Sequence, residues 1–272
     1  MSGAGAARLS WLGWSGFRIT APDGAELYVD PPGGSHFAPE RAAHILITHG
    51  HPEHVQGTLD LVRDPERHAA VVVAAGAGVC RYLRTRARPE SDRFLVCVPQ
   101  GRFDLGGFDI DVFSWRHMPL LPPGWDAKLR HLRALASRPG LALRVLLAGL
   151  RGPWPFPMLG FRIARPGCPR MLVYGEGLHR HAGAQAVAQV GRLLPAELLL
   201  AAVEPEDVDE LPDLVAHVGT PEVALYQAHQ PWREAFGMPL ADLDELAAVL
   251  ALAGRRTIVF RPGATETTLG AG

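Results

Sequence analysis

Short apolar runs, each bounded by glycine, proline or aspartate, dominate the chain up to residue 115. Such runs predict buried strands joined by tight turns. Apolar residues spaced three and four apart, as in a helix, replace this pattern only twice. The predicted strands cover residues 8–14, 17–20, 25–34, 42–50, 69–75, 93–98, 101–107 and 108–115, and the predicted helices cover residues 53–64 and 78–88. We expect the last three of these strands to pair in hairpin style.

The second half of the chain alternates between strand and helix patterns. Its predicted strands cover residues 159–166, 170–177, 196–203, 222–229 and 256–260, and its predicted helices cover residues 181–194, 206–218 and 240–253. A strand-rich half followed by such alternation predicts an α/β fold in which two sheets pack face to face with helices outside. We expect one domain over residues 1–272, an insertion at about 118–158, and a frayed terminus after residue 260.

Composition narrows the class of protein. The chain has 272 residues, 47% of them apolar, so we expect a large core. Its net charge is −1, so we do not expect an electrostatic field that attracts nucleic acid. The N-terminus lacks the pattern of a signal peptide, and no apolar run is long enough to span a bilayer. These features predict a soluble, cytoplasmic protein. Cys80, Cys97 and Cys168 are widely spaced, which favours small buried side chains over a disulfide or a thiolate zinc site.

The stretch "THGHPEHVQG", residues 48–57, follows the apolar run "HILI" directly. It holds His49, His51, Glu53 and His54, four side chains suited to bind zinc, iron or manganese. An extended backbone directs His49 and His51 to the same side. The competing interpretation is a solvated polar loop with incidental histidines. We favour a metal site because packing does not explain three histidines within six residues.

This spacing resembles the HxHxDH signature of the metallo-β-lactamase superfamily, with Glu53 where that family has aspartate. "RLSWLGWSGFRIT" and "AELYVDP" resemble the opening of its branch that contains ascorbate-phosphate lactonases (UlaG-like) and N-acyl-phosphatidylethanolamine phospholipase D. "GRFDLGGFDIDVFSWRH", "GFRIARPGCPRMLVYGEG" and "EVALYQAH" resemble its later ligand strands. The resemblance implies a four-layer αβ/βα sandwich with a binuclear metal site at one edge.

The resemblance also implies which residues hold the two divalent metal ions, zinc first and manganese or iron as alternatives. His49, His51 and His117 would hold one ion, Glu53, His54 and His229 the other, and Glu176 would bridge them. Taken alone, His117 and His229 are also typical of surface histidines, and Glu176 of a turn. Asp30 and His179 are candidates to orient the ligands. Both expected aspartates are glutamates, which adds one methylene at each position.

The insertion combines basic and apolar residues. Between His117 and Pro169 there are eight Lys or Arg residues and one acid, Asp126, so the rest of the chain is acidic. This pattern suits a lid over a lipid-like anion, or a segment that touches a membrane surface. The alternative is a pair of helices that pack their leucines on the sandwich. The candidate lid residues are Trp125, Arg130, Arg133 and Trp154.

Three functions fit these observations. The first is a metallo-hydrolase that uses a metal-bound hydroxide on an ester, lactone or phosphodiester, with Glu53 as a ligand and proton acceptor. The second is a di-iron enzyme for redox or dioxygen chemistry on the same fold. The third is a non-catalytic relative that binds a ligand or a membrane. The expected partner is a small-molecule or lipid-like substrate, and the oligomeric state is left open.

Overall fold

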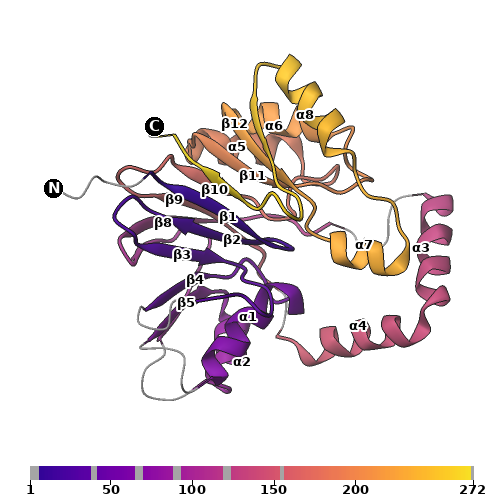
Figure 1. Cartoon of the computed structure of the whole chain (residues 1–272), viewed down its shortest axis with the longest axis horizontal. Coiled ribbons are helices and arrows are strands. Elements are labelled where there is room, and N and C mark those ends of the chain that lie inside the picture. Colours follow the sequence, from indigo (N-terminus) through magenta and orange to yellow (C-terminus); the bar gives the residue numbers. More distant parts are fainter. Residues whose placement is uncertain are drawn as a thin grey trace.

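A computed structural model describes residues 6–37, 42–64, 70–87, 93–118, 124–153 and 156–270. Its strands form two mixed sheets of seven strands each, which face one another (Figure 1). The predicted sandwich of two sheets is confirmed. Trp154 lies outside the described residues, as do residues 119–123 of the predicted insertion.

The first sheet comes mainly from the N-terminal half of the chain. The pairs β14–β1, β1–β2 and β2–β3 are antiparallel, and β3 to β6 are parallel. In sheet order, its strands are β14 (Glu266–Thr268), β1 (Arg8–Gly13), β2 (Gly16–Thr20), β3 (Glu26–Val29), β4 (Ala43–Leu46), β5 (Val71–Ala75) and β6 (Arg93–Val96).

The second sheet repeats this arrangement. Its strands β7 to β10 are antiparallel, and β10 to β13 are parallel. In sheet order, its strands are β13 (Arg256–Val259), β12 (Glu222–Tyr226), β11 (Leu198–Ala202), β10 (Met171–Val173), β9 (Leu159–Ala164), β8 (Phe108–Ser114) and β7 (Arg102–Leu105).

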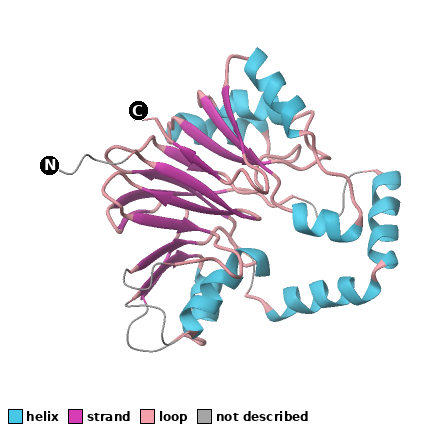
Figure 2. Cartoon of the chain, in the orientation of Figure 1, coloured by secondary structure: helices cyan, strands magenta, loops and turns pink. Residues whose placement is uncertain are grey.

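Helices cover the outer faces of both sheets (Figure 2). The described helices are α1 (Pro52–Arg63), α2 (Ala77–Arg84), α3 (Trp125–Ser137), α4 (Pro139–Arg151), α5 (Ala184–Leu193), α6 (Leu211–Val218), α7 (Gln230–Phe236) and α8 (Leu243–Leu252). The central core between the sheets contains Phe17, Phe108 and Phe161. Separate apolar clusters lie under α1 and α2 and under α5, α6 and α8. The result is the four-layer αβ/βα order.

Three details differ from the sequence predictions. β6 does not form a hairpin with β7, because it follows α2 and joins β5 in parallel as a β–α–β unit. The C-terminal segment is not frayed at residues 266–268. There β14 covers the edge of β1, and the Ser10 hydroxyl donates a hydrogen bond to Glu266, 2.8 Å away. Helix α7 was not predicted, since its seven residues are too few for a visible apolar period.

The carboxyl ends of several strands meet at one edge of the sandwich. The loops after β3, β4, β8, β10, β11 and β12 all begin there, and chemistry-bearing side chains commonly gather at such an edge. Helix α1 approaches this edge closely because residue 57 is glycine. A Cβ there would lie 2.3 Å from the carbonyl oxygens of Pro31 and Pro32. The loops after β3 and β4 are thereby held together.

Helices α3 and α4 stand apart from the layers (Figure 1). They form an L-shaped arm whose first helix packs near α7. No residue of α4 is buried, and Leu143, Leu146 and Leu150 are exposed, so these three leucines do not pack on the sandwich as that alternative requires. Among the described residues, no helix has the length and apolar character needed to cross a bilayer.

Candidate metal centre

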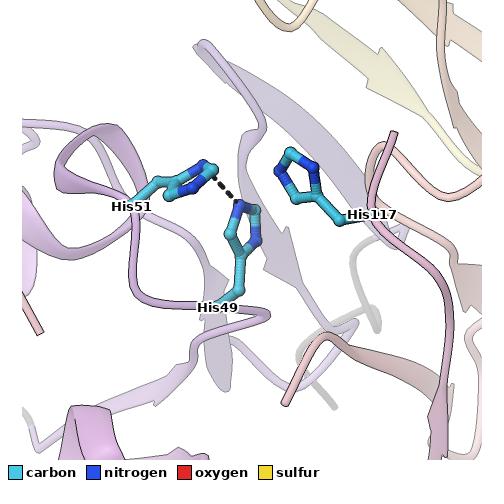
Figure 3. Close-up of side chains that lie close together, drawn as sticks. All are labelled: His49, His51 and His117. Carbon is cyan, nitrogen blue, oxygen red and sulfur yellow. Dashed lines mark hydrogen bonds between the residues drawn. The ribbon is translucent and has the colours of Figure 1, made fainter. Parts of the chain in front are cut away.

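Three histidines from two strand ends converge at the edge of the sandwich. His49 and His51 follow β4, and His117 follows β8 (Figure 3). The Nε2 atom of His49 lies 3.1 Å from the Nδ1 atom of His51. Each of the three offers a ligand atom within 4.8 Å of the others. Nitrogen ligands about 2.1 Å from one tetrahedral zinc ion lie little more than about 3 Å apart, so this cluster needs only small shifts to bind a metal.

A second cluster shares His49 with the first. It consists of His49, His54 and Glu176, which offer ligand atoms within 4.8 Å of one another. Glu176 follows β10, and its Oε1 atom lies 3.2 Å from Nε2 of His54 and 3.5 Å from Nε2 of His229. The structure therefore brings His54, Glu176 and His229 to one place from three different loops. All three side chains are at least three-quarters buried.

Asp30 anchors the histidine loop from below. Its carboxylate accepts hydrogen bonds from the backbone N–H of Thr48 at 2.8 Å, the Thr48 hydroxyl at 2.6 Å and Nδ1–H of His54 at 2.8 Å. Burial alone would lower the pKa of His54, but Asp30 and Glu176 outweigh it and hold that pKa well above its usual value. Asp30 thus has the orienting position that the sequence suggested for it.

In four histidines, the Nδ1 atom of the ring forms a hydrogen bond with another part of the protein. Nδ1–H of His54 donates to Asp30, that of His117 donates to the carbonyl of Met118 at 2.6 Å, and that of His229 donates to Glu204 at 2.6 Å. Nδ1 of His49 lies 3.0 Å from the Thr48 hydroxyl, which already donates to Asp30 and is therefore the acceptor. Once such a ring is neutral, Nε2 is the atom left to coordinate a metal, in exchange for the contacts that Nε2 of His49 makes with His51 and Nε2 of His54 makes with Glu176.

Among the buried polar atoms without a hydrogen-bond partner in the described residues, two belong to the predicted ligands. They are Nε2 of His117 and Oε2 of Glu176. Leaving such atoms unpaired costs about 1–3 kcal/mol each, more for a charged group. A divalent cation would coordinate both and would offset the negative charge of the buried carboxylates. The residues present therefore fit a metal ion.

Glu204 is a functional candidate that the sequence analysis missed. It follows β11, is 7% exposed, and accepts hydrogen bonds from His229 and from Arg233 at 2.7 Å and 3.1 Å. Burial alone would lower the pKa of His229, but Glu176 and Glu204 together raise it to about 10. The available signal was the position of Glu204 directly after a predicted buried strand, at the same edge as the other loops.

Two predicted residues lie apart from the clusters. Glu53 is in the first turn of α1, and its Oε1 atom is 3.9 Å from Nδ1 of His51, outside both metal-binding clusters found among the described residues. His179 donates from Nε2 to the carbonyl of Arg116 at 2.7 Å, so it supports the segment that carries His117. The assignment of Glu53 as a ligand stays a prediction.

A cavity of about 320 Å³ opens beside the metal-binding residues. His51, Glu53, His117 and His229 line its inner end. Its walls are mainly apolar and come from α3, α4, α7 and the loop after α7: Leu135, Val145, Trp232, Phe236 and Met238. The acidic and basic residues on its wall pair with one another, as in the contacts of Arg233 with Glu204 and Glu206.

Trp125, Arg130 and Arg133, the predicted lid residues that the structure describes, do not line this cavity. Trp125 is 79% exposed, and Arg130 and Arg133 are also exposed. Other residues of the same helix, His131 and Leu135, form the cavity wall instead. The insertion is therefore next to the metal edge, as its place after His117 suggested, but it presents different side chains from those predicted.

Comparison with known proteins supports the fold and the metal-binding edge. Residues 8–128 match the model of the Beta-lactamase superfamily domain, a stretch that includes the histidine loop and His117. A UPF0173 metal-dependent hydrolase of Xanthobacter autotrophicus is 30% identical over 119 residues, and one of Paracoccus denitrificans is 39% identical over 119 residues. Each match covers 40% of this chain and 48% of the relative, so the chain matches about half the length of these curated relatives.

Solved structures match almost the whole chain at low identity. The metallo-β-lactamase fold protein YhfI from Bacillus subtilis is 11% identical with a TM-score of 0.61, and the match covers 96% of this chain and 99% of that one. CmlA, a diiron β-hydroxylase from Streptomyces venezuelae, is 15% identical with a TM-score of 0.58, over 97% of this chain and 54% of that one. At such identities the likeness shows the fold alone.

The two-sheet sandwich, the histidine loop and these matches define a metallo-β-lactamase fold with a metal-binding edge. Residues 8–128 therefore resemble the Beta-lactamase superfamily domain, and almost the whole chain shares the metallo-β-lactamase fold of solved structures. These matches do not single out the lactonase and phospholipase D branch that the sequence resembles, so that branch stays a prediction.

Proposed function

We propose that the chain is a metal-dependent hydrolase that cleaves an ester, lactone or phosphodiester. One observation carries the proposal: four imidazoles have Nδ1 fixed by protein acceptors, which leaves their Nε2 atoms for a metal beside the buried carboxylate of Glu176. Bound divalent metals would supply a water of lowered pKa and a Lewis acid. For two ions, zinc first, the Nε2 atom of His49 would serve only one, together with His51 and His117, while His54 and His229 would hold the other beside Glu176.

The cavity walls favour a substrate with an apolar part. Trp232 and Phe236 stack with their ring centroids 6.0 Å apart and form an apolar wall with Met238. Small-molecule sites commonly combine such walls with a few polar groups that fix orientation. Here Glu53 is the polar group at the inner end, 3.9 Å from His51, where it can accept a proton from a reacting water.

A second candidate is a di-iron enzyme for redox or dioxygen chemistry. It is favoured by the likeness to CmlA, named a diiron β-hydroxylase, and by two glutamates where the superfamily pattern has aspartates. Metal identity separates the two candidates, because a hydrolase functions with zinc and the redox reaction needs iron.

The first experiment measures metal content by elemental mass spectrometry on protein purified without chelators or a histidine-rich tag. The same protein is assayed against a panel of phosphodiesters, esters and lactones. Zinc or manganese with turnover is the expected result. Iron without turnover would favour the redox candidate, and no metal even after reconstitution would overturn both.

Single substitutions then test the site. His51→Ala and His54→Ala are expected to lose metal and turnover while the chain stays folded. His217→Ala is the matched control, since His217 is an exposed histidine on α6 that contacts only its own helix among the described residues. Full activity in either site variant would contradict the assignment.

A further inference from the structure

The arm formed by α3 and α4 exposes an unusual amount of apolar surface. Trp125 is 79% exposed, and the exposed leucines of the arm are Leu129 (45%), Leu132 (50%), Leu143 (55%), Leu146 (59%) and Leu150 (72%). Single exposed leucines are common on protein surfaces, but a patch of this size indicates a binding surface.

The same arm is strongly basic. Residues 124–152 hold six basic residues and one acid, a net charge of +5, and because the whole chain carries −1, the remainder carries −6. No ion pair joins any of these basic side chains to another described residue. Elsewhere in the described chain, Arg165, Arg180 and Arg233 are all paired with carboxylates. The arm therefore presents positive charge that its own chain does not neutralise.

The exposed leucines and the arginines lie next to one another around each helix. In α3, Trp125, Leu129 and Leu132 recur at intervals of four and three, which places them on one stripe. Arg133 follows on the adjoining side, roughly opposite the side of Leu135, which lines the cavity.

Helix α4 repeats this arrangement. Its exposed stripe is Leu143, Leu146 and Leu150, and Arg144 lies about a quarter turn from it. Val145 lies on a different side and lines the cavity. In both helices one side faces the cavity, while an apolar stripe edged with arginine stays uncovered.

We propose that the arm is a binding surface for anionic lipid bilayers. A bilayer interface takes up leucine and tryptophan side chains while its anionic headgroups pair with arginine, which matches both features at once. Nucleic acid would pair with the arginines but would leave the leucines exposed to water. A second copy of the chain would also cover the leucines, and ultracentrifugation without lipid makes that copy an outcome of the test.

The test is co-sedimentation of the full chain with vesicles of phosphatidylcholine alone and with vesicles that also contain phosphatidylglycerol. We expect clear binding only to the anionic vesicles, and weaker binding as salt is raised. The test needs no turnover, so it can fail or succeed independently of the proposed hydrolysis.

Two variants separate the charge from the apolar stripe. Arg130→Gln with Arg133→Gln is expected to weaken vesicle binding about thirtyfold, at about 1 kcal/mol for each basic residue near the surface. Leu143→Ser with Leu146→Ser should also weaken it. The matched control is Arg192→Gln with Leu193→Ser, which changes an exposed arginine and an exposed leucine on α5 and should bind like the parent.

Several results would overturn the proposal. They are no binding of the parent to anionic vesicles, equal binding to both vesicle types, or unchanged binding of both arm variants when circular dichroism shows them folded. Analytical ultracentrifugation without lipid is the last check. Dimers of the parent that dissociate in the leucine variant would assign the surface to a second copy instead.

Discussion

The metal edge and the α3–α4 arm differ in whether their side chains have partners within the chain. At the metal edge, buried charged groups have partners supplied by neighbouring loops, and the few unpaired atoms point to a metal. On the arm, leucines are exposed and basic side chains have no carboxylate partner among the described residues. The side chains of the edge therefore have partners within the chain, whereas those of the arm need partners from another molecule or surface.

A row of alternating charges accounts for the order of the metal edge. Negative and positive groups follow one another across the ends of both sheets, each within 3.5 Å of the next. The row runs Asp30, His54, Glu176, His229, Glu204 and Arg233. Because each of the four inner members lies between two partners, removing one takes a contact away from two buried neighbours, which is costly. The arm has no such row, and this difference can be tested.

The largest effect is expected at the middle of the row. Glu176→Gln removes the carboxylate that both His54 and His229 contact. We expect metal affinity to fall more than about 100-fold, since even loss of a partner that only orients a ligand costs about 10–100-fold. A metal titration against a competing chelator measures this. Glu197→Gln is the control, because its pair with Arg170 is at the surface and should leave affinity unchanged.

A middle-sized effect is expected one step away from the metal. Asp30→Asn keeps an oxygen that can accept from the Thr48 N–H but lacks the charge that holds His54. Metal affinity should fall about 10–100-fold, with a loss of about 1–3 kcal/mol in the free energy of unfolding. Urea titration and metal competition measure the two quantities. Unchanged affinity in the folded variant would show that Asp30 is structural only.

Glu204→Gln should have a smaller effect on the same quantity. His229 is 22% exposed at its side chain, so water can replace part of the lost contact. We expect about a tenfold loss of metal affinity. If this loss exceeds that of Asp30→Asn, then Glu204 after β11 contributes more to metal affinity than Asp30 after β3.

The sequence predicted which histidines meet at this edge because they follow apolar strands directly, and their role as metal ligands stays a prediction. His49, His117 and His229 each come after a run whose burial the pattern reveals, and the strands β4, β8 and β12 that precede them all end at this edge. Glu204 occupies the same kind of position but stands alone, without a histidine beside it. Its role depends on a contact with His229, which is 25 residues away.

Other features of the fold depend on pairing partners that local patterns do not encode. β14 is three residues long and polar, so only its hydrogen bonds to β1 identify it as a strand. In the arm, the structure has the pair of helices that one interpretation of the insertion expected. Which side would be covered was not predictable, because an apolar stripe is the same whether it faces the chain's own core or a partner.

The smallest effect is expected on the arm. Leu146→Ser and Leu150→Ser remove side chains that are 59% and 72% exposed, so each should change the free energy of unfolding by less than about 0.5 kcal/mol. Leu159→Ala, at a fully buried position of β9, should cost about 2–5 kcal/mol by contrast. Urea denaturation of the three variants measures the difference. A loss above about 1 kcal/mol at either arm position that depends on protein concentration would mean that copies of the chain cover these leucines in solution. A loss that is independent of concentration would mean that the arm packs on its own sandwich, and the contrast between the two regions would fail.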